Sequence, residues 1–209
     1  MSTTLSEILI AVNSYTDLEA SEPTGPELTT RVDFAKQAVR EWAESSQWKE
    51  LSRTYVVDPS TLASISLPTD FAEFESAPQQ LDGTWIEFPV IDARDQYGKG
   101  LTDKYCILYG DKASGFTAVL NYLTASATLS ITYQAQPSLM ATLSDTCIVP
   151  DPEFVKTKII SYVLQSRSDD RFPTVNAEAS RLLQNMIGRS QVGHGQVNRV
   201  PHNSTFRLE

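Results

Sequence analysis

An apolar stripe between residues 27 and 48 constrains the fold of this chain more than any other feature of its sequence. Its members recur at spacings of four, three, four and three, in the order Leu28, Val32, Ala35, Val39 and Trp42. That spacing places them on one face of an α-helix, and the proline just before the stripe suits a first helical turn. The sequence therefore predicts a helix from about Glu27 to Trp48. A stripe of this length and bulk must be covered by another element of the chain.

A short helix is expected before the stripe, from about Thr4 to Asn13. Ser2 or Thr3 can cap it, and Glu7 lies near the position of a capping-box partner. The polar segment between this helix and the stripe is rich in turn residues and predicts a loop.

Two more helices are expected near the other end of the chain. Pro152 suits a first helical position, and apolar residues then recur at helical spacing to about Arg167. A final helix follows, capped by Thr174 and closed by Gly188. Residues 1–51 and 151–188 are therefore expected to form a helical bundle that covers the stripe.

Short runs rich in β-branched and aromatic residues fill the middle of the chain. Residues 53–58 and 61–67 predict a hairpin across Asp58-Pro59-Ser60. The next segment predicts a turn that sets Phe71 and Phe74 against a core. Residues 85–91 predict a strand that Pro89 confines to an edge or a bulge.

Three later runs predict an antiparallel meander that belongs to a small sandwich: residues 104–109, 116–122 and 127–134. Residues 52–150 are thus expected to be a β-rich insertion. The predicted fold class is α+β: a helical bundle from the N- and C-terminal segments, an inserted antiparallel β-sandwich-like region, and an extended C-terminal tail at residues 189–209.

The charge of the chain is unevenly distributed. Its net charge is -9, with 18 acids and 7 bases up to Asp103 and 8 acids and 10 bases after it. A broad nucleic-acid interface would need clustered Lys and Arg, which the acidic first half lacks. We also expect no membrane span and no signal peptide, because no apolar run is long enough and no basic start precedes one.

Residues that could carry chemistry do not converge in the sequence. Asp169 and Asp170 are adjacent in a predicted turn, and the acids at 92, 95 and 103 do not match a calcium loop. Residues 110–115 lack the end of a phosphate loop and join two strands, which favours a hairpin loop. Only His194 and His202 could serve a triad or a metal, and they lie in the predicted tail. We therefore predict no catalytic residue, no cofactor and no metal.

Two cysteines, Cys106 and Cys147, lie in apolar, strand-like contexts. This setting favours buried reduced thiols, with a disulfide between the two as the alternative.

The C-terminal tail combines a few apolar anchors with a polar chain. The residues that stand out are Val197, Arg199, Val200, His202, Phe206, Arg207 and Leu208. Segments that become ordered on a partner have this composition, whereas an idle terminus is the alternative.

The order of these elements resembles the head-to-tail adaptor proteins of tailed bacteriophages, also called head-completion, connector or neck proteins. The resemblance covers Leu5 to Ile187. It begins with a short helix and a long one ending in Trp48-Lys49-Glu50-Leu51. It continues through the turn Leu67-Pro68-Thr69-Asp70-Phe71, the strand Tyr105 to Gly110, and Ile131-Thr132-Tyr133 before Pro137. It ends with a proline-initiated helix pair interrupted between Arg167 and Arg171.

The resemblance implies a structural virion protein, made in the host cytoplasm, that forms a ring of usually twelve copies beneath the portal protein. Such a ring continues the DNA channel, through which DNA passes without sequence-specific binding, and carries the next neck or tail protein. A C-terminal extension that reaches the portal would correspond here to residues 189–209, including the anchors named above. The alternatives are another phage structural part, such as a tail-completion or tail terminator protein, and a small hydrolase using Asp169 or His194.

Overall fold

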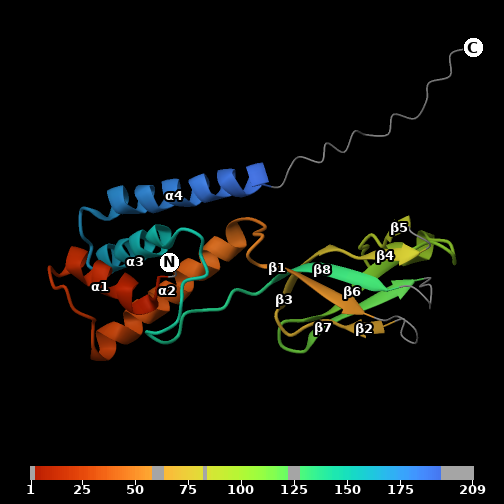
Figure 1. Cartoon of the computed structure of the whole chain (residues 1–209), viewed down its shortest axis with the longest axis horizontal. Coiled ribbons are helices and arrows are strands. Elements are labelled where there is room, and N and C mark those ends of the chain that lie inside the picture. Colours follow the sequence, from red (N-terminus) through yellow and green to blue (C-terminus); the bar gives the residue numbers. More distant parts are fainter. Residues whose placement is uncertain (1–2, 58–63, 82–83, 122–127, 194–209) are drawn as a thin grey trace, which may run out of the picture. The chain divides into compact units, whose positions relative to one another are not determined.

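The contacts within the chain divide it into two units. A computed structural model describes residues 3–57, 64–81, 84–121 and 128–193. The helical unit combines Met1–Ser46 with Leu139–Glu209, and the β unit is Gln47–Ser138. Within the described residues, the four α-helices are α1 (Leu5–Thr16), α2 (Gly25–Ser45), α3 (Pro152–Ser166) and α4 (Phe172–Gly193), and all four belong to the helical unit (Figure 1).

The first helix, α1, begins with a reciprocal cap. The Thr4 hydroxyl accepts a hydrogen bond from the Glu7 backbone N–H at 3.3 Å, and the Glu7 carboxylate accepts one from the Thr4 N–H at 2.8 Å. The cap is therefore Thr4 rather than the predicted Ser2 or Thr3, and Glu7 is its capping-box partner.

The second helix, α2, contains the apolar stripe that the sequence predicts. Ala35, Val39 and Trp42 are fully buried. The helix ends at Ser45, three residues before the predicted end at Trp48. The Ser45 hydroxyl donates to the Trp42 carbonyl at 2.7 Å, an alternative to the next helical hydrogen bond, and Ser46 is already extended.

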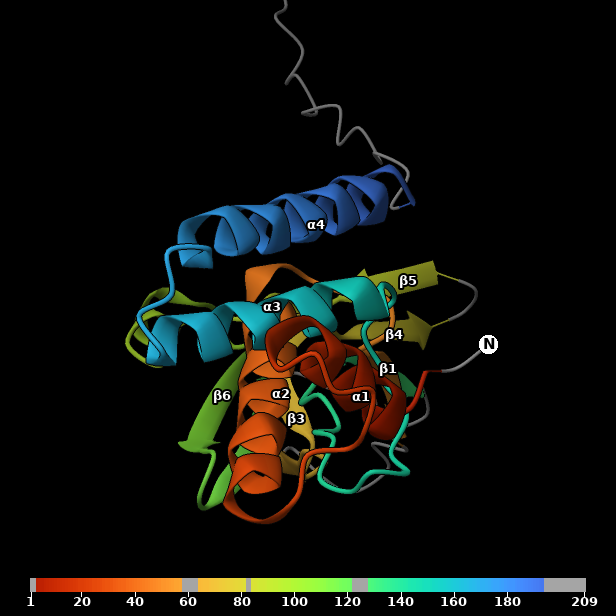
Figure 2. The same ribbon diagram turned by 90° about the vertical axis from the view of Figure 1, so that its left-hand side faces the viewer.

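The third helix, α3, lies at the centre of the helical unit. It packs against α1, α2 and α4, and Figure 2 shows it between α4 on one side and α1 with α2 on the other. A helix surrounded in this way must be apolar on nearly all faces. Accordingly, nine of its residues are buried, including Phe154, Ile159 and Leu164. Asp151 caps its start, where its carboxylate accepts from the Glu153 N–H at 3.1 Å.

The fourth helix, α4, packs along α3 and runs antiparallel to it (Figure 2). It continues through Gly188 to Gly193, so the predicted closure at Gly188 is wrong. Gly188 has open space where a Cβ would lie and stays within the helix. Arg189, expected to begin the extended tail, is therefore helical. Residues 194–209 lie outside the described part of the chain.

The segment from Leu139 to the start of α3 also belongs to the helical unit. Thr146 forms a β-bridge with Thr4, and the Leu5 N–H donates to the Asp145 carbonyl at 2.9 Å. The sequence predicts these residues as part of the β-rich insertion. Their extended conformation suggested a strand, but their partner is the start of α1.

The β unit contains two antiparallel sheets. One has the order β1-β8-β4-β5, with β3 also paired to β8, and the other has the order β2-β7-β6. The strands are β1 (Ser52–Val57), β2 (Ser64–Ser66), β3 (Phe71–Ser76), β4 (Pro78–Leu81), β5 (Thr84–Glu87), β6 (Tyr105–Asp111), β7 (Gly115–Asn121) and β8 (Leu129–Ala135). A short 3₁₀ turn, η1 (Asp95–Gly98), lies between β5 and β6.

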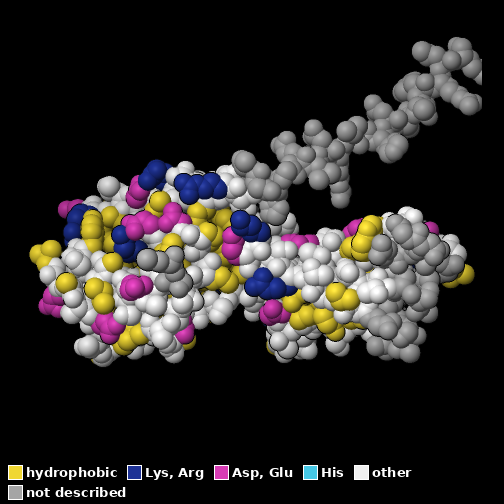
Figure 3. Space-filling view, viewed as in Figure 1, with side chains coloured by type: hydrophobic (Ala, Val, Ile, Leu, Met, Phe, Trp, Pro, Cys, Tyr) yellow, Lys and Arg dark blue, Asp and Glu magenta, His cyan; other side chains and the backbone are white. Residues whose placement is uncertain are grey.

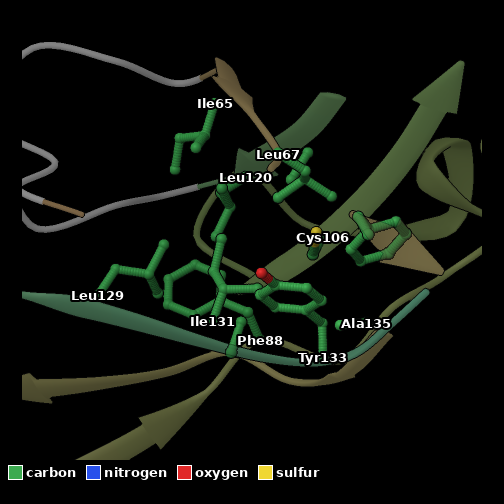
Figure 4. Packing of buried hydrophobic residues seen from close by; sticks show 12 residues of the cluster. Ile65, Leu67, Phe88, Cys106, Leu120, Leu129, Ile131, Tyr133 and Ala135 are labelled. Atoms are coloured by element: carbon green, nitrogen blue, oxygen red, sulfur yellow. The ribbon is translucent and has the colours of Figure 1, made fainter. Parts of the chain in front are cut away.

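Side chains from both sheets form one apolar core. The cluster includes Leu67, Cys106, Leu120, Ile131 and Tyr133, which converge between the sheets in Figure 4. Phe71 is buried and Phe74 packs partly buried against the same cluster, as predicted. Two sheets that share one core in this way form a sandwich-like arrangement.

The predicted strand pairing is wrong in two places. The hairpin between residues 53–58 and 61–67 does not form, because β1 pairs with β8 and β2 pairs with β7. The meander also breaks after its second strand: β6 and β7 form a hairpin, but β8 lies in the other sheet. β8 is buried at five of its seven positions, as expected for a central strand. β4 was not predicted at all.

The fold class is confirmed as α+β, with helices and antiparallel sheets. None of the helices in the described ranges is long and apolar enough to cross a membrane.

Candidate functional site

The predicted contact residues of the tail lie outside the described residues. This holds for Val197, Arg199, Val200, His202, Phe206, Arg207 and Leu208. His194 lies outside them as well, just after the last residue of α4.

The adjacent acids at 169 and 170 are part of the turn between α3 and α4. The Asp169 carboxylate accepts from the Arg171 guanidinium at 2.8 Å and from the Arg171 backbone N–H at 2.9 Å. These hydrogen bonds lower the pKa of Asp169 to about 2. Asp169 is therefore held ionised in a turn, the opposite of what a general acid requires.

The loop at residues 110–115 is the turn of the β6–β7 hairpin, as predicted. One Asp111 oxygen accepts from the N–H groups of Ala113 and Ser114, each at 2.8 Å, and these bonds lower the pKa of Asp111. The same oxygen accepts from the Ser114 hydroxyl at 3.0 Å. The polar groups of this loop thus satisfy one another.

Two acids of the 92–103 loop form contacts within that loop. Asp92 pairs with Arg94 at 3.2 Å, and Asp103 accepts from the Gly100 N–H at 2.8 Å. Across the described ranges, no group of three or more His, Cys, Asp or Glu residues is placed to hold a metal ion.

Both cysteines are free thiols. Burial in the β core raises the pKa of Cys106 to about 11, and burial also raises the pKa of Cys147. Neither has the lowered pKa of a reactive thiol.

The most developed polar group in the helical unit is a cluster that the sequence analysis missed. We call it the Arg31 cluster: Thr16, Asp17, Glu27, Arg31 and Arg167. The Arg31 side chain is only 3% exposed, and its Nη2 lies 2.9 Å from Asp17 and 2.6 Å from Glu27. Arg167, the C-cap of α3, places its Nη1 2.7 Å from the other Asp17 oxygen. The cluster therefore joins the end of α1, the start of α2 and the end of α3.

The electrostatics of this cluster favour the ionised acid. The hydrogen bond from Arg167 is the largest influence on Asp17 and, with those from Thr16 and Arg31, lowers its pKa to about 2 against the opposing effect of burial. Asp17 in turn raises the pKa of Arg167. A buried arginine held by two carboxylates is a structural cross-link, since it offers no open position for a substrate.

A second polar cluster joins α2, α3 and α4. We call it the Lys158 cluster: Glu41, Lys158, Tyr162 and Asn176. Lys158 Nζ lies 2.9 Å from a Glu41 oxygen and 3.3 Å from the Asn176 amide oxygen. The Tyr162 hydroxyl donates to Glu41 at 2.6 Å. Burial is the largest cause that raises the pKa of Tyr162, and the Glu41 carboxylate raises it further. Like the Arg31 cluster, it fixes helices rather than exposing a reactive group.

A weak sequence signal accompanied each cluster. Glu27 and Arg31 stand four residues apart, the spacing of a helical ion pair. Arg31 also falls within the apolar stripe, between Leu28 and Ala35, where a charge needs a buried partner. Lys158 likewise lies between the buried Val155 and Ile159. The partners from other helices could not be found by spacing.

The two clusters thus cross-link the helices of the helical unit. A comparison with models of protein families matches residues 3–204 to the SU10 adaptor protein family. A search among curated proteins found none that matches. The family match spans both units, all of α4 and most of the tail, including Val197, Arg199, Val200 and His202. The chain therefore belongs to the SU10 adaptor protein family.

Proposed function

We propose that this protein is a structural component of the virion that forms a ring beneath the portal, extends the DNA channel and joins the capsid to the tail. The family match over residues 3–204 carries the proposal. The ring contains twelve copies in this proposal, and the protein is an adaptor without enzymatic activity.

The internal cross-links of the helical unit suit a mounting element. The Arg31 and Lys158 clusters tie all four helices through buried or partly buried charges. A surface that is already rigid loses little conformational entropy when it assembles. A ring built from such units would hold its partners in a defined geometry.

The polar face of α2 is the proposed contact between neighbouring copies. Asp33, Gln37, Arg40 and Glu44 are exposed and recur at spacings of four, three and four, so they share one stripe opposite the buried one. The stripe holds both signs of charge, which allows one copy to complement another.

The tail is the proposed contact with the portal. The segment after Gly193 has 16 residues, 194–209, and could reach about 55 Å if extended. Its apolar anchors are Val197, Val200, Phe206 and Leu208, and its cations are Arg199 and Arg207, with His202 between them. Because the family match runs on to residue 204, most of this segment belongs to the shared sequence pattern.

The net charge of -9 supports passage of DNA without binding to it. Acidic walls repel phosphate, so a duplex can slide past them without being held.

Co-production of the full chain with the portal protein of the same phage tests the proposal. We expect a complex in which electron microscopy shows a twelvefold ring of this chain coaxial with the portal. Val197→Asp with Val200→Asp should prevent the ring from joining the portal, whereas Val56→Asp with Val90→Asp, on exposed positions of the β unit, should not. Co-purification with tails but not with the portal would replace the proposal with a tail-completion or tail terminator role.

A further inference from the structure

An exposed leucine sits in a backbone conformation that leucine disfavours. Leu18 follows the C-cap of α1, has a φ of 59°, and is 90% exposed. This left-handed conformation at a helix end normally belongs to glycine, which has no Cβ to clash with the backbone. Among the described residues, the only other non-glycine position with positive φ is Ser168, at 52°. A leucine here helps neither the backbone nor the core of the isolated chain.

The groups beside Leu18 are fixed in place by contacts between helices. The Arg171 guanidinium carbon lies 5.5 Å from the centroid of the Tyr15 ring, and Tyr15 is 44% exposed. Arg171 is also held by Asp169, and Arg167 holds Asp17, the neighbour of Leu18. Tyrosine and arginine side chains that are already ordered are frequent anchors of protein interfaces.

The charge around Leu18 is acidic. Residues 15–19 and 167–171 contain four acids and two arginines, a net of -2. Ion pairs account for Asp17 and Asp169, whereas Glu19 and Asp170 form none with the described part of the chain. Figure 3 shows hydrophobic side chains beside charged ones at this end of the helical unit. Such a surface repels nucleic acid, and it repels a second copy whose net charge is -9.

This surface lies far from the point where the tail leaves the helical unit. The Arg171–Tyr15 contact places it at the first turn of α4, and α4 then runs 22 residues to Gly193. A helix of that length spans about 33 Å, and Figure 1 shows its two ends at opposite sides of the helical unit. A partner docked at Leu18 would therefore contact the end of the helical unit opposite the point where the tail leaves it.

We propose that Tyr15, Leu18, Glu19, Asp170 and Arg171, which we call the end patch, dock the next neck or tail protein. Leu18 enters an apolar socket on that protein, and basic residues around the socket pair with the unpaired acids. The inference rests on the proposed adaptor function and assigns one of its two protein partners to one surface.

Replacing Leu18 with glycine separates docking from folding. Glycine adopts a φ of 59° without strain, so the Tm should change by no more than about 3 °C. Loss of the leucine side chain should weaken binding of the neck or tail protein at least tenfold. A tenfold change corresponds to about 1.4 kcal/mol, and burial of a leucine side chain contributes at least this much. Ser168→Gly relieves the same backbone conformation at the end of α3, and Leu101→Ser removes an equally exposed leucine (93%) from the β unit. Both controls should bind normally.

The experiment uses the full chain assembled on the portal, and the separately purified neck and tail proteins of the same phage as probes. A photo-crosslinking residue at position 18 should join one of those proteins. A crosslink to the portal or to a second copy of this chain would overturn the inference, as would equal binding by Leu18→Gly and the unaltered chain. Failure of the unaltered chain to form a ring on the portal would instead remove the proposed function, and the inference with it.

Discussion

Replacing Arg31 with methionine tests whether the Arg31 cluster stabilises the helical unit. The Arg31 side chain is 3% exposed and contacts Asp17, Glu27 and the Thr16 hydroxyl. Methionine fills much of the same volume with an apolar chain, so the substitution removes the charge without opening a large cavity. The change in stability then reports mainly the lost hydrogen bonds and ion pairs.

The expected loss is smaller than for an isolated buried pair. Removing one partner of a buried ion pair costs about 3–5 kcal/mol when the other charge stays uncompensated. Here Arg167 still holds Asp17 at 2.7 Å, and the side chains of Asp17 and Glu27 are 28% and 45% exposed. We therefore expect Arg31→Met to lower the free energy of unfolding of the helical unit by about 2 kcal/mol.

Urea unfolding followed by far-ultraviolet circular dichroism measures this loss. With an m-value of about 2 kcal/mol per molar urea, the helical transition should shift by about 1 M. The matched control is Lys36→Met on the same helix. Lys36 pairs at 3.1 Å with the Asp33 carboxylate, which is 64% exposed, so its loss should cost less than about 0.5 kcal/mol. Equal midpoints for the two variants would refute a stabilising role for the Arg31 cluster.

The pH dependence of the free energy of unfolding is a second test of the Arg31 cluster. The folded-state pKa of Asp17 is about 2, below its ordinary value of 3.8, with the Arg167 hydrogen bond as the largest cause. A lowered pKa means that the stabilisation is fully present above about 3.8 and is lost as the pH falls through about 2. The difference in stability between the unaltered chain and Arg167→Met, which removes that largest cause, should therefore shrink over that window. A difference that stays constant down to the lower pH would show that Asp17 is not the partner that matters.

Two further substitutions test local features of each unit. Gly110 has a φ of 104°, and a Cβ there would lie 2.0 Å from the Gly115 carbonyl oxygen, so Gly110→Ala should destabilise the β6–β7 hairpin by about 2 kcal/mol or more. Hydrogen exchange of the hairpin amides should rise in that variant but not in Gly98→Ala, where no atom lies within 4 Å of the added Cβ. Thr4→Ala removes the hydroxyl that caps α1 and should cost about 1 kcal/mol in urea unfolding. Glu7→Gln keeps the reciprocal hydrogen bond and should cost less; a larger loss in Glu7→Gln would contradict the capping-box account.

Sequence periodicity predicted elements well and their partners poorly. The stripe in α2 was correct because helical spacing is local, and Ala35, Val39 and Trp42 are buried. The pairing of a strand depends on which distant segment of the chain lies beside it. The alternation of apolar and polar residues within a strand does not encode that partner. The residues after β7 read as the next strand of a meander, yet β8 pairs with β1, β3 and β4 instead.

The same limit applies to the polar clusters and the docking surfaces. Arg31 and Glu27 could be paired from their spacing, but a solvent-exposed helix shows the same spacing. Burial of Arg31 depends on Asp17 and Arg167 arriving from other helices, 14 and 136 residues away along the chain. Leu18 gave no signal at all, because a loop leucine is ordinary until its φ is known. The portal contacts in the tail stay a prediction.

The two clusters change which helix the helical unit is built around. The stripe pointed to α2, but α3 is the helix that contacts the other three and contributes Lys158 and Arg167 to the clusters. Lys158 meets Glu41, and Arg167 lies 3.7 Å from Glu27, so charges hold α2 at two points 14 residues apart. The stripe therefore supplies apolar area that α2 buries, and these paired charges add a contact with α3 near each end of α2.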